Sequence, residues 1–272
     1  HGVVGFDTAH KAAAAEFPKS KYIITVDADN IVDPKFFKLT IPVKAGGQVS
    51  YTWGGRQYTN GLMYGNGGLK MWSTEHLANM KSHELADDQR DAVDFCWDFE
   101  RYKDLPGCYS NVYTNASAYQ AFRVGFREGV KLSMEQGRVL AFDEWITTMH
   151  AANYQRLLTW LTIGADVEHG MWSVYGARLA VYLLQYESFD FVQIRDYAWF
   201  KEFFNDHANA DPLRASKSIG KKISDGMGWI LPDFDSEQSN FIKMIQLHPA
   251  RPLTNEDVQW QTNLSMFGWF NG

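Results

Sequence analysis

Hydrophobic and polar positions follow two different patterns along this chain, and the pattern changes near residue 116. Tyr22-Ile-Ile-Thr-Val26 is a run of β-branched and aromatic side chains, which predicts a buried strand. From Ala118 onward, apolar side chains recur with helical spacing. We therefore expect an α/β fold with a mixed sheet over residues 1–115 and a largely helical part over 116–272, as two domains or as one continuous domain.

Capping and breaking signals refine the first part. Asp7 is expected to cap a helix that runs to Phe17, and Asp33-Pro34 supplies the N-cap and first residue of a second helix. A third is expected to follow Ser73 as its cap and to run to Met80. Residues 49–53 alternate as in a strand, which Gly54-Gly55 is expected to end.

The second part carries a regular apolar stripe. Phe122, Phe126 and Val130 recur at i, i+4 and i+8, which predicts the buried face of a helix. Further helices are expected over residues 142–163, 172–186 and 194–204.

Composition restricts the class of protein. The chain has 272 residues, of which 45% are hydrophobic, enough for a sizeable core. It contains no apolar run long enough to span a membrane and no signal peptide, so we expect a cytoplasmic protein without a membrane partner. A net charge of −6 disfavours a broad nucleic-acid surface, which needs clustered basic side chains.

Two carboxylates come directly after the predicted strand, Asp27 and Asp29. Ligands of open α/β sheets bind beyond the carboxyl ends of strands. Paired carboxylates suit Mg²⁺ or Mn²⁺, which takes its other ligands from water and substrate phosphates. The pattern therefore favours a nucleoside diphosphate as ligand. The alternative is an acidic turn in which Asn30 and Asp33 act as turn formers.

The strand followed by Asp27-Ala-Asp29 resembles the DxD motif of the GT-A superfamily of glycosyltransferases. Tyr64-Gly-Asn-Gly-Gly-Leu-Lys-Met-Trp72 is similar to the Gly-Gly segment of such enzymes. The wider pattern also resembles uncharacterised glycosyltransferase-like proteins of phages and marine viruses. The resemblance implies a Rossmann-like sheet, with Asp29 as direct metal ligand and Asp27 contacting the ribose or the metal through water.

The chain departs from that family before the acid pair. GT-A enzymes place nucleotide-binding strands ahead of the motif, whereas only 26 residues precede Asp27 here. Either the chain is a fragment, or the missing layer comes from elsewhere. Whether it acts alone is therefore open.

The resemblance also implies further site residues. A later histidine commonly completes the metal site, and His248 fits best, at the end of a predicted strand, with His169 as competitor. Arg251 is suited to contact phosphate. The substrate-binding set expected on the acceptor side is Asn66, Gly67, Gly68 and Trp72.

A carboxylate base is expected in inverting enzymes of this kind, within reach of the acceptor hydroxyl. Asp94 and Asp98 fit by position, within the polar and acidic stretch 83–111, and Asp143-Glu144 is a second option. The alternative is that Asp94 and Asp98 belong to an ordinary solvated helix face. A retaining reaction would not need this base.

The expected function is therefore a metal-dependent hexosyl- or pentosyltransferase. It would use Mn²⁺ or Mg²⁺ to move a sugar from a nucleotide-sugar donor to a hydroxyl of a glycan, a modified nucleotide or a protein. The alternative is a catalytically silent protein that keeps the scaffold and binds a carbohydrate or a partner. No P-loop, Gly-x-Ser-x-Gly or His-Glu-x-x-His motif is present in the sequence.

Overall fold

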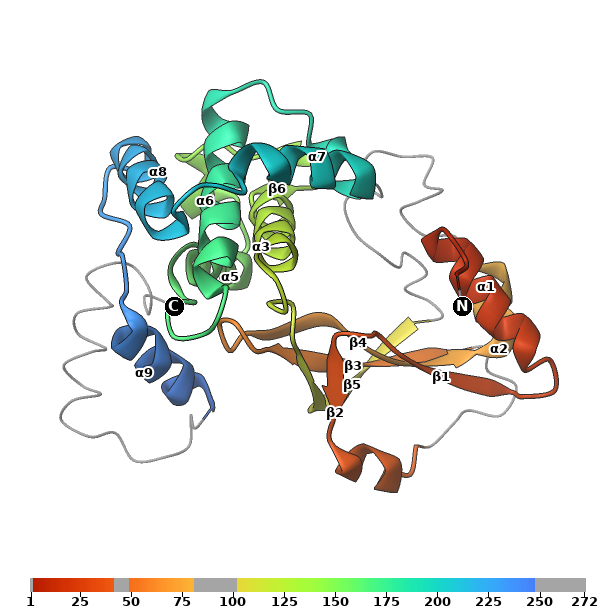
Figure 1. The fold of residues 1–272 in the computed structure, drawn as a ribbon. Coiled ribbons are helices and arrows are strands. Elements are labelled where there is room, and N and C mark those ends of the chain that lie inside the picture. The colour runs from red at the N-terminus through yellow and green to blue at the C-terminus, as the bar shows by residue number, and fades with distance from the viewer. Residues whose placement is uncertain (1, 42–48, 81–101, 248–272) are drawn as a thin grey trace. The chain divides into compact units, whose positions relative to one another are not determined.

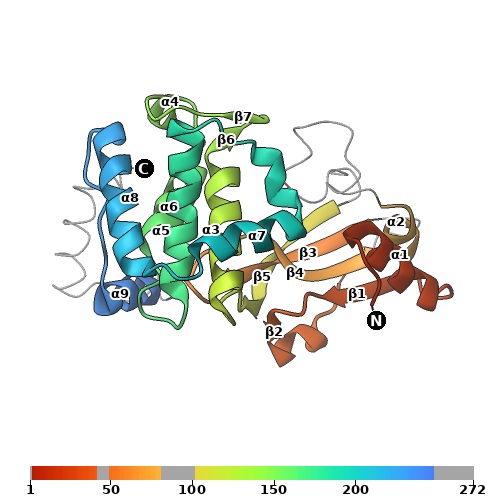
Figure 2. The same cartoon turned by 45° about the horizontal axis from the view of Figure 1, so that its top comes forward.

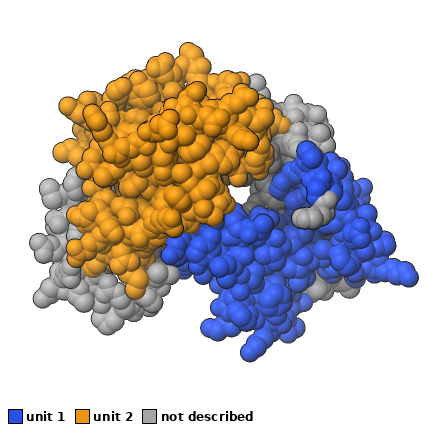
Figure 3. Space-filling view, viewed as in Figure 1, with its two compact units in different colours: residues 1–58, 63–113 blue, residues 59–62, 114–272 orange. Residues whose placement is uncertain are grey.

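A computed structural model describes residues 2–41, 49–80 and 102–247 of the chain. It is a mixed α/β protein with a mixed sheet (Figures 1 and 2). The chain divides into two compact units (Figure 3): unit 1 comprises residues 1–58 and 63–113, and unit 2 comprises 59–62 and 114–272.

A five-stranded sheet with the order β1-β4-β3-β5-β2 forms the centre of unit 1. The strands are β1 (Tyr22–Val26), β2 (Asn30–Val32), β3 (Ser50–Gln57), β4 (Met63–Ser73) and β5 (Tyr102–Val112). β3 and β5 run parallel, and the other neighbouring pairs are antiparallel. The strand predicted over 22–26 is confirmed with these bounds, but the prediction that it is buried is wrong: β1 is an edge strand, and none of its residues is fully buried.

The sheet cannot be flat where β1 passes into β2. These strands form its two edges, yet only residues 27–29 join them. Four strand spacings amount to about 19 Å, whereas the chain from Val26 to Asn30 can extend only about 14 Å. The sheet therefore bends at this end, where β3 shifts register against both neighbours around Gly54.

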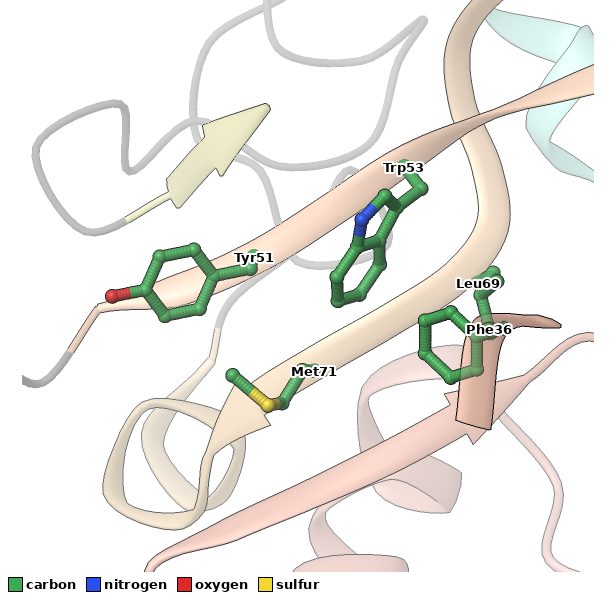
Figure 4. Close-up of a cluster of buried hydrophobic side chains, with 5 residues drawn as sticks. All are labelled: Phe36, Tyr51, Trp53, Leu69 and Met71. Atoms are coloured by element: carbon green, nitrogen blue, oxygen red, sulfur yellow. The ribbon is translucent and has the colours of Figure 1, made fainter. Parts of the chain in front are cut away.

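The two faces of the sheet pack against different elements. Leu69 and Met71 of β4 point to one face, where the 3₁₀ helix Pro34–Lys38 covers them with Phe36, and Tyr51 and Trp53 of β3 complete this cluster (Figure 4). On the other face Trp72 packs with α1 (Phe6–Glu16) and α2 (Thr74–Asn79), which lie side by side in Figures 1 and 2. Successive side chains of β4 point to opposite faces of the sheet, so this strand contributes to both apolar clusters.

Two of the three caps predicted in unit 1 are confirmed, those at Asp33 and Ser73, whereas Asp7 lies inside α1 after its N-cap Gly5 and does not cap it. Oδ1 of Asp33 accepts a hydrogen bond from the Lys35 amide at 2.8 Å. Oγ of Ser73 accepts one from the His76 amide at 3.4 Å. Each cap satisfies a backbone donor that the first turn leaves unpaired.

Unit 2 consists mainly of helices, together with a short hairpin, β6 (Met134–Glu135) and β7 (Arg138–Val139). The helices are α3 (Ala118–Leu132), α4 (Glu144–Thr147), α5 (Ala151–Thr162), α6 (Gly170–Tyr186), α7 (Tyr197–His207), α8 (Pro212–Met227) and α9 (Ser236–Leu247). The stripe predicted on α3 is confirmed, since Phe122, Phe126 and Val130 are fully buried. None of the described helices is long and apolar enough to cross a membrane.

Glycines let α3 and α6 pack with their backbones in contact. A Cβ added at Gly125 would overlap the carbonyl oxygen of Ser173, and one at Gly176 would overlap that of Phe122. Gly129 lies one turn along α3, where a Cβ would be 2.7 Å from the Ala177 carbonyl oxygen. The helix pair therefore requires residues without side chains at these positions.

A buried ion pair ties the segment between β3 and β4 to the helices of unit 2. Nζ of Lys243 on α9 contacts Oδ2 of Asp166 and lies 3.5 Å from the carbonyl oxygen of Thr59. The Lys243 and Asp166 side chains are both about nine-tenths buried. Removing one partner would leave the other charge buried without compensation.

Several predicted boundaries are wrong. β3 continues through Gly54-Gly55, because the glycines form a bulge that shifts register without ending the strand. The Gly-Gly segment, expected to be either a loop beside the donor sugar or a hairpin turn, lies within β4. β5 occupies part of the stretch 83–111, where no strand was predicted.

The helical part differs from expectation in three places. The expected helix 142–163 is two helices, because His150 caps α5 through the Ala152 amide. The expected helix 194–204 begins later, after Asp196 caps α7. The strand expected before His248 is the end of α9.

Replacing Gly125 with Ala should lower the free energy of unfolding by at least about 2 kcal/mol, even though alanine is the better helix former by about 1 kcal/mol. The reason is the collision with the Ser173 carbonyl. Urea unfolding measures the loss, with the partly exposed Arg127→Ala in the same helix as control. A stability equal to or above that of the wild type would contradict the packing described for α3 and α6.

Replacing Lys243 with Met should lower the free energy of unfolding by about 3 kcal/mol, because Asp166 would stay buried without its cation. Lys201→Met, which removes an exposed charge from α7, is the matched control and should change it by less than about 0.5 kcal/mol. Equal losses in the two variants would show that the buried pair contributes nothing specific.

Candidate functional site

Backbone hydrogen bonds hold the turn after β1 on two sides. The Asp27 amide donates to the carbonyl of Gly68 on β4 at 2.9 Å. The carbonyl of Asp29 accepts from the Tyr113 amide, just past β5, at 2.7 Å. The Asn30 amide closes the turn by donating to the Asp27 carbonyl at 3.0 Å. Both carboxylates are therefore carried by a backbone fixed to two strands of the sheet.

Gly68 is the residue that lets the turn lie against β4. Its φ is +76°, in the left-handed region. A Cβ built on it would lie 2.8 Å from Oδ2 of Asp27 and 2.9 Å from Nδ2 of Asn30. A side chain at this position would displace the carboxylate of Asp27, so the glycine is a structural requirement of the acid pair.

A buried lysine lies beside the acid pair. Lys70 is opposite Thr25 in the β1–β4 register, and Asp27 follows Thr25 by two residues, on the same face of the sheet. Nζ of Lys70 is 3.9 Å from Oδ2 of Asp27. The Lys70 side chain is 3% exposed and that of Asp27 is 50% exposed. The negative pair at the surface is thus backed by a positive charge in the interior.

Polar side chains flank Lys70 on both neighbouring strands. Thr25 of β1 and Thr52 of β3 are its direct partners in register. Oγ1 of Thr25 accepts a hydrogen bond from Nε1 of Trp72 at 2.9 Å. Oγ1 of Thr52 is buried and has no hydrogen-bond partner within the described part of the chain. This row of Thr25, Lys70 and Thr52 is polar, although apolar clusters lie on both faces of the sheet.

The structure describes only some of the other predicted site residues. Trp72, expected to contact substrate, is fully buried with its indole N–H satisfied by Thr25, so it belongs to the core. Asn66 and Gly67 lie in β4, but the structure does not describe the Asn66 side chain or the burial of either residue. The remaining predicted residues lie outside the described ranges as well: Asp94, Asp98, His248 and Arg251.

The alternative candidates belong to unit 2. His169 stands at the start of α6 with a φ of 57°, and its Nε2 is 3.7 Å from Oε1 of Glu168. The hydrogen bond from Arg138 lowers the pKa of Glu144, which makes this carboxylate a weaker base. Glu144 therefore fits an ion pair with Arg138 better than a catalytic role.

The acid pair alone is an incomplete metal site. Within residues 2–41, 49–80 and 102–247, no group of three His, Cys, Asp or Glu side chains is close enough to hold a metal ion. Two carboxylates suit Mg²⁺ or Mn²⁺ when water and phosphate oxygens supply the other ligands. The donor set thus fits a metal that arrives with a phosphate ligand.

A hollow of about 650 Å³ lies elsewhere in unit 1, between α1 and α2. Its lining includes Lys11, Lys21 and Thr74. Lys21 precedes β1 and Asp27 follows it, so the hollow and the acid pair flank opposite ends of a strand about 17 Å long. Nothing in the sequence pattern indicated this hollow, and it does not contain the predicted chemistry.

No protein family, curated protein or solved structure matches this chain. The likeness to GT-A enzymes therefore rests on short motifs. The function has to be inferred from the side chains at the end of β1.

Replacing Gly68 with Ala should lower the free energy of unfolding by at least about 2 kcal/mol, because left-handed strain of about 1 kcal/mol adds to the clash with Asp27. Gly228→Ala is a matched control: Gly228 has the same φ of +76°, and a Cβ there meets nothing within 4 Å. The difference between the two losses isolates the contact with Asp27. Equal losses would mean that Gly68 serves only its backbone conformation.

Proposed function

We propose that this protein is a metal-dependent glycosyltransferase that binds the diphosphate of a nucleotide sugar at the end of β1. The observation that carries the proposal is the Asp27 and Asp29 pair, held by backbone hydrogen bonds to Gly68 and Tyr113. A turn fixed in this way needs little rearrangement to accept a cation, and preorganisation of that kind increases affinity.

Asp29 and Asp27 would hold Mn²⁺ or Mg²⁺ together with the diphosphate. The metal would neutralise the charge that develops on the leaving diphosphate. Of the two, Asp29 is the direct ligand that the resemblance to GT-A enzymes implies, and Asp27 lies beside Lys70.

The transfer breaks the bond between the anomeric carbon and the diphosphate oxygen, and it forms one to an acceptor oxygen. If the reaction inverts configuration, a carboxylate must take the proton of the acceptor hydroxyl. Asp94 and Asp98 remain the predicted bases. His248 and Arg251 remain the predicted third metal ligand and phosphate contact. The acceptor is a glycan, a modified nucleotide or a protein.

The second candidate is a catalytically silent protein that binds a partner. The exposed apolar side chains of β1 favour it, since Ile24 and Val26 are 48% and 44% exposed. β1 is also an edge strand, which is a common place for another chain to add a strand. Release of nucleoside diphosphate from a panel of nucleotide sugars separates the candidates, because a silent protein would release none in any acceptor mixture.

Mn²⁺ should raise the affinity of the wild-type protein for a nucleoside diphosphate at least about tenfold, or 1.4 kcal/mol. Asp29→Ala should remove this dependence on metal, because the direct carboxylate ligand is lost. Isothermal titration with and without Mn²⁺ measures both effects.

Asp33→Asn is the matched control for this experiment. It removes one negative charge four positions further along the chain, and asparagine caps the following helix as well as aspartate does. Its metal dependence should equal that of the wild type. A metal dependence that survives in Asp29→Ala would refute the assignment of the acid pair.

A further inference from the structure

Lys70 is a buried charge beside the proposed metal site, and the motif resemblance assigns it no role. It lies in β4 on the face that packs against α1 and α2, where Trp72 lies two residues further along the strand. A buried ammonium group is costly unless polar or negative groups compensate it. Asp27 provides that compensation from the turn above, with Oδ2 at 3.9 Å from Nζ.

The register of the sheet fixes this arrangement. Lys70 is paired with Thr25 on β1 and with Thr52 on β3, so its side chain lies between two other strands. Gly68 precedes Lys70 by two residues and has no side chain to separate Asp27 from β4. The β1–β4 pairing therefore fixes the backbone of Lys70 next to the turn that carries Asp27.

A cation in this position changes what the acid pair attracts. In the protein without ligand, Lys70 offsets the charge of Asp27, so the turn presents less negative charge than two isolated carboxylates would. A divalent ion bound there would also be repelled by the ammonium group, and burial weakens the screening of that repulsion. A bound diphosphate reverses the balance, because its negative charge attracts both the metal and Lys70.

We propose that Lys70 is a specificity-determining residue that makes divalent-metal binding at Asp27 and Asp29 depend on a bound diphosphate. The inference rests on the proposed function of the acid pair. It assigns Lys70 two effects of opposite sign: it weakens the binding of metal alone, and it strengthens the binding of diphosphate alone. A lysine that only filled space in the core would produce neither.

The test is Lys70→Met, which keeps a long unbranched side chain and removes the charge. Mn²⁺ alone should bind this variant about tenfold more tightly than the wild type. A nucleoside diphosphate without metal should bind it about tenfold more weakly. Titration calorimetry measures both, and Lys70→Arg, which keeps the charge, should keep the wild-type pattern.

Lys21→Met is the matched control, because it removes an exposed lysine at the other end of β1 with the same change in net charge. It should leave both affinities at wild-type values. If Lys70→Met does not fold, the inference is tested with Asp27→Asn, which changes the half-exposed partner of Lys70 and leaves the buried lysine in place. Asp27→Asn should raise metal-free diphosphate affinity at least about tenfold above that of Asp33→Asn, which loses the same charge further from Lys70.

The outcomes separate this inference from the proposed function. Metal-dependent nucleotide binding in the wild type together with unchanged affinities in Lys70→Met would overturn the role of Lys70 alone. Weaker Mn²⁺ binding in Lys70→Met would also overturn it, because Lys70 would then support the metal. A wild-type protein that binds neither Mn²⁺ nor the nucleotide would overturn both proposals.

Discussion

The hydrogen bond between the Asp27 amide and the Gly68 carbonyl is the contact on which the proposed site depends. It extends the β1–β4 ladder by one residue beyond β1, and so carries the acid pair onto the end of β4. The contact is possible because Gly68 has a positive φ and no Cβ. From this one constraint follow the position of Asp27, its distance to Lys70 and the sharp turn into β2.

Glycines also allow close backbone contact in unit 2. Gly125 and Gly176 let two helix backbones touch, just as Gly68 lets a turn touch a strand. In both units glycine allows two backbone segments to approach closely. In the helix pair, this contact outweighs the poor helix propensity of glycine. Gly68, Gly125 and Gly176 therefore mark places where an added side chain would collide with the fold.

Local signals in the sequence were sufficient for many elements. β1, the caps at Asp33 and Ser73 and the buried stripe of α3 follow from short patterns, and the structure confirms them. β5 was missed because Pro106 and Gly107 interrupt it, and its pairing with β3 is supplied by distant residues. Trp72 was misplaced because the pattern of β4 does not show that α1 and α2 cover the face on which it lies.

The candidate site likewise contains residues that the sequence could predict and residues that it could not. Asp27 and Asp29 could be found from the sequence, because a strand followed by paired carboxylates is a local pattern. The roles of Gly68 and Lys70 could not, because they depend on the register between β1 and β4. One signal was available for Lys70: a charged residue stands between Leu69 and Met71 in an apolar stretch, where burial would require a partner.

The most direct measurement is anomalous diffraction at the manganese edge from crystals grown with Mn²⁺ and a nucleoside diphosphate. The account predicts a peak at about 2.2 Å from an Asp29 carboxylate oxygen, with diphosphate oxygens completing the coordination. Lys70 should remain beside Asp27 in the same map. A nucleotide bound elsewhere in the molecule, with the Asp29 carboxylate free of metal, would contradict the central claim.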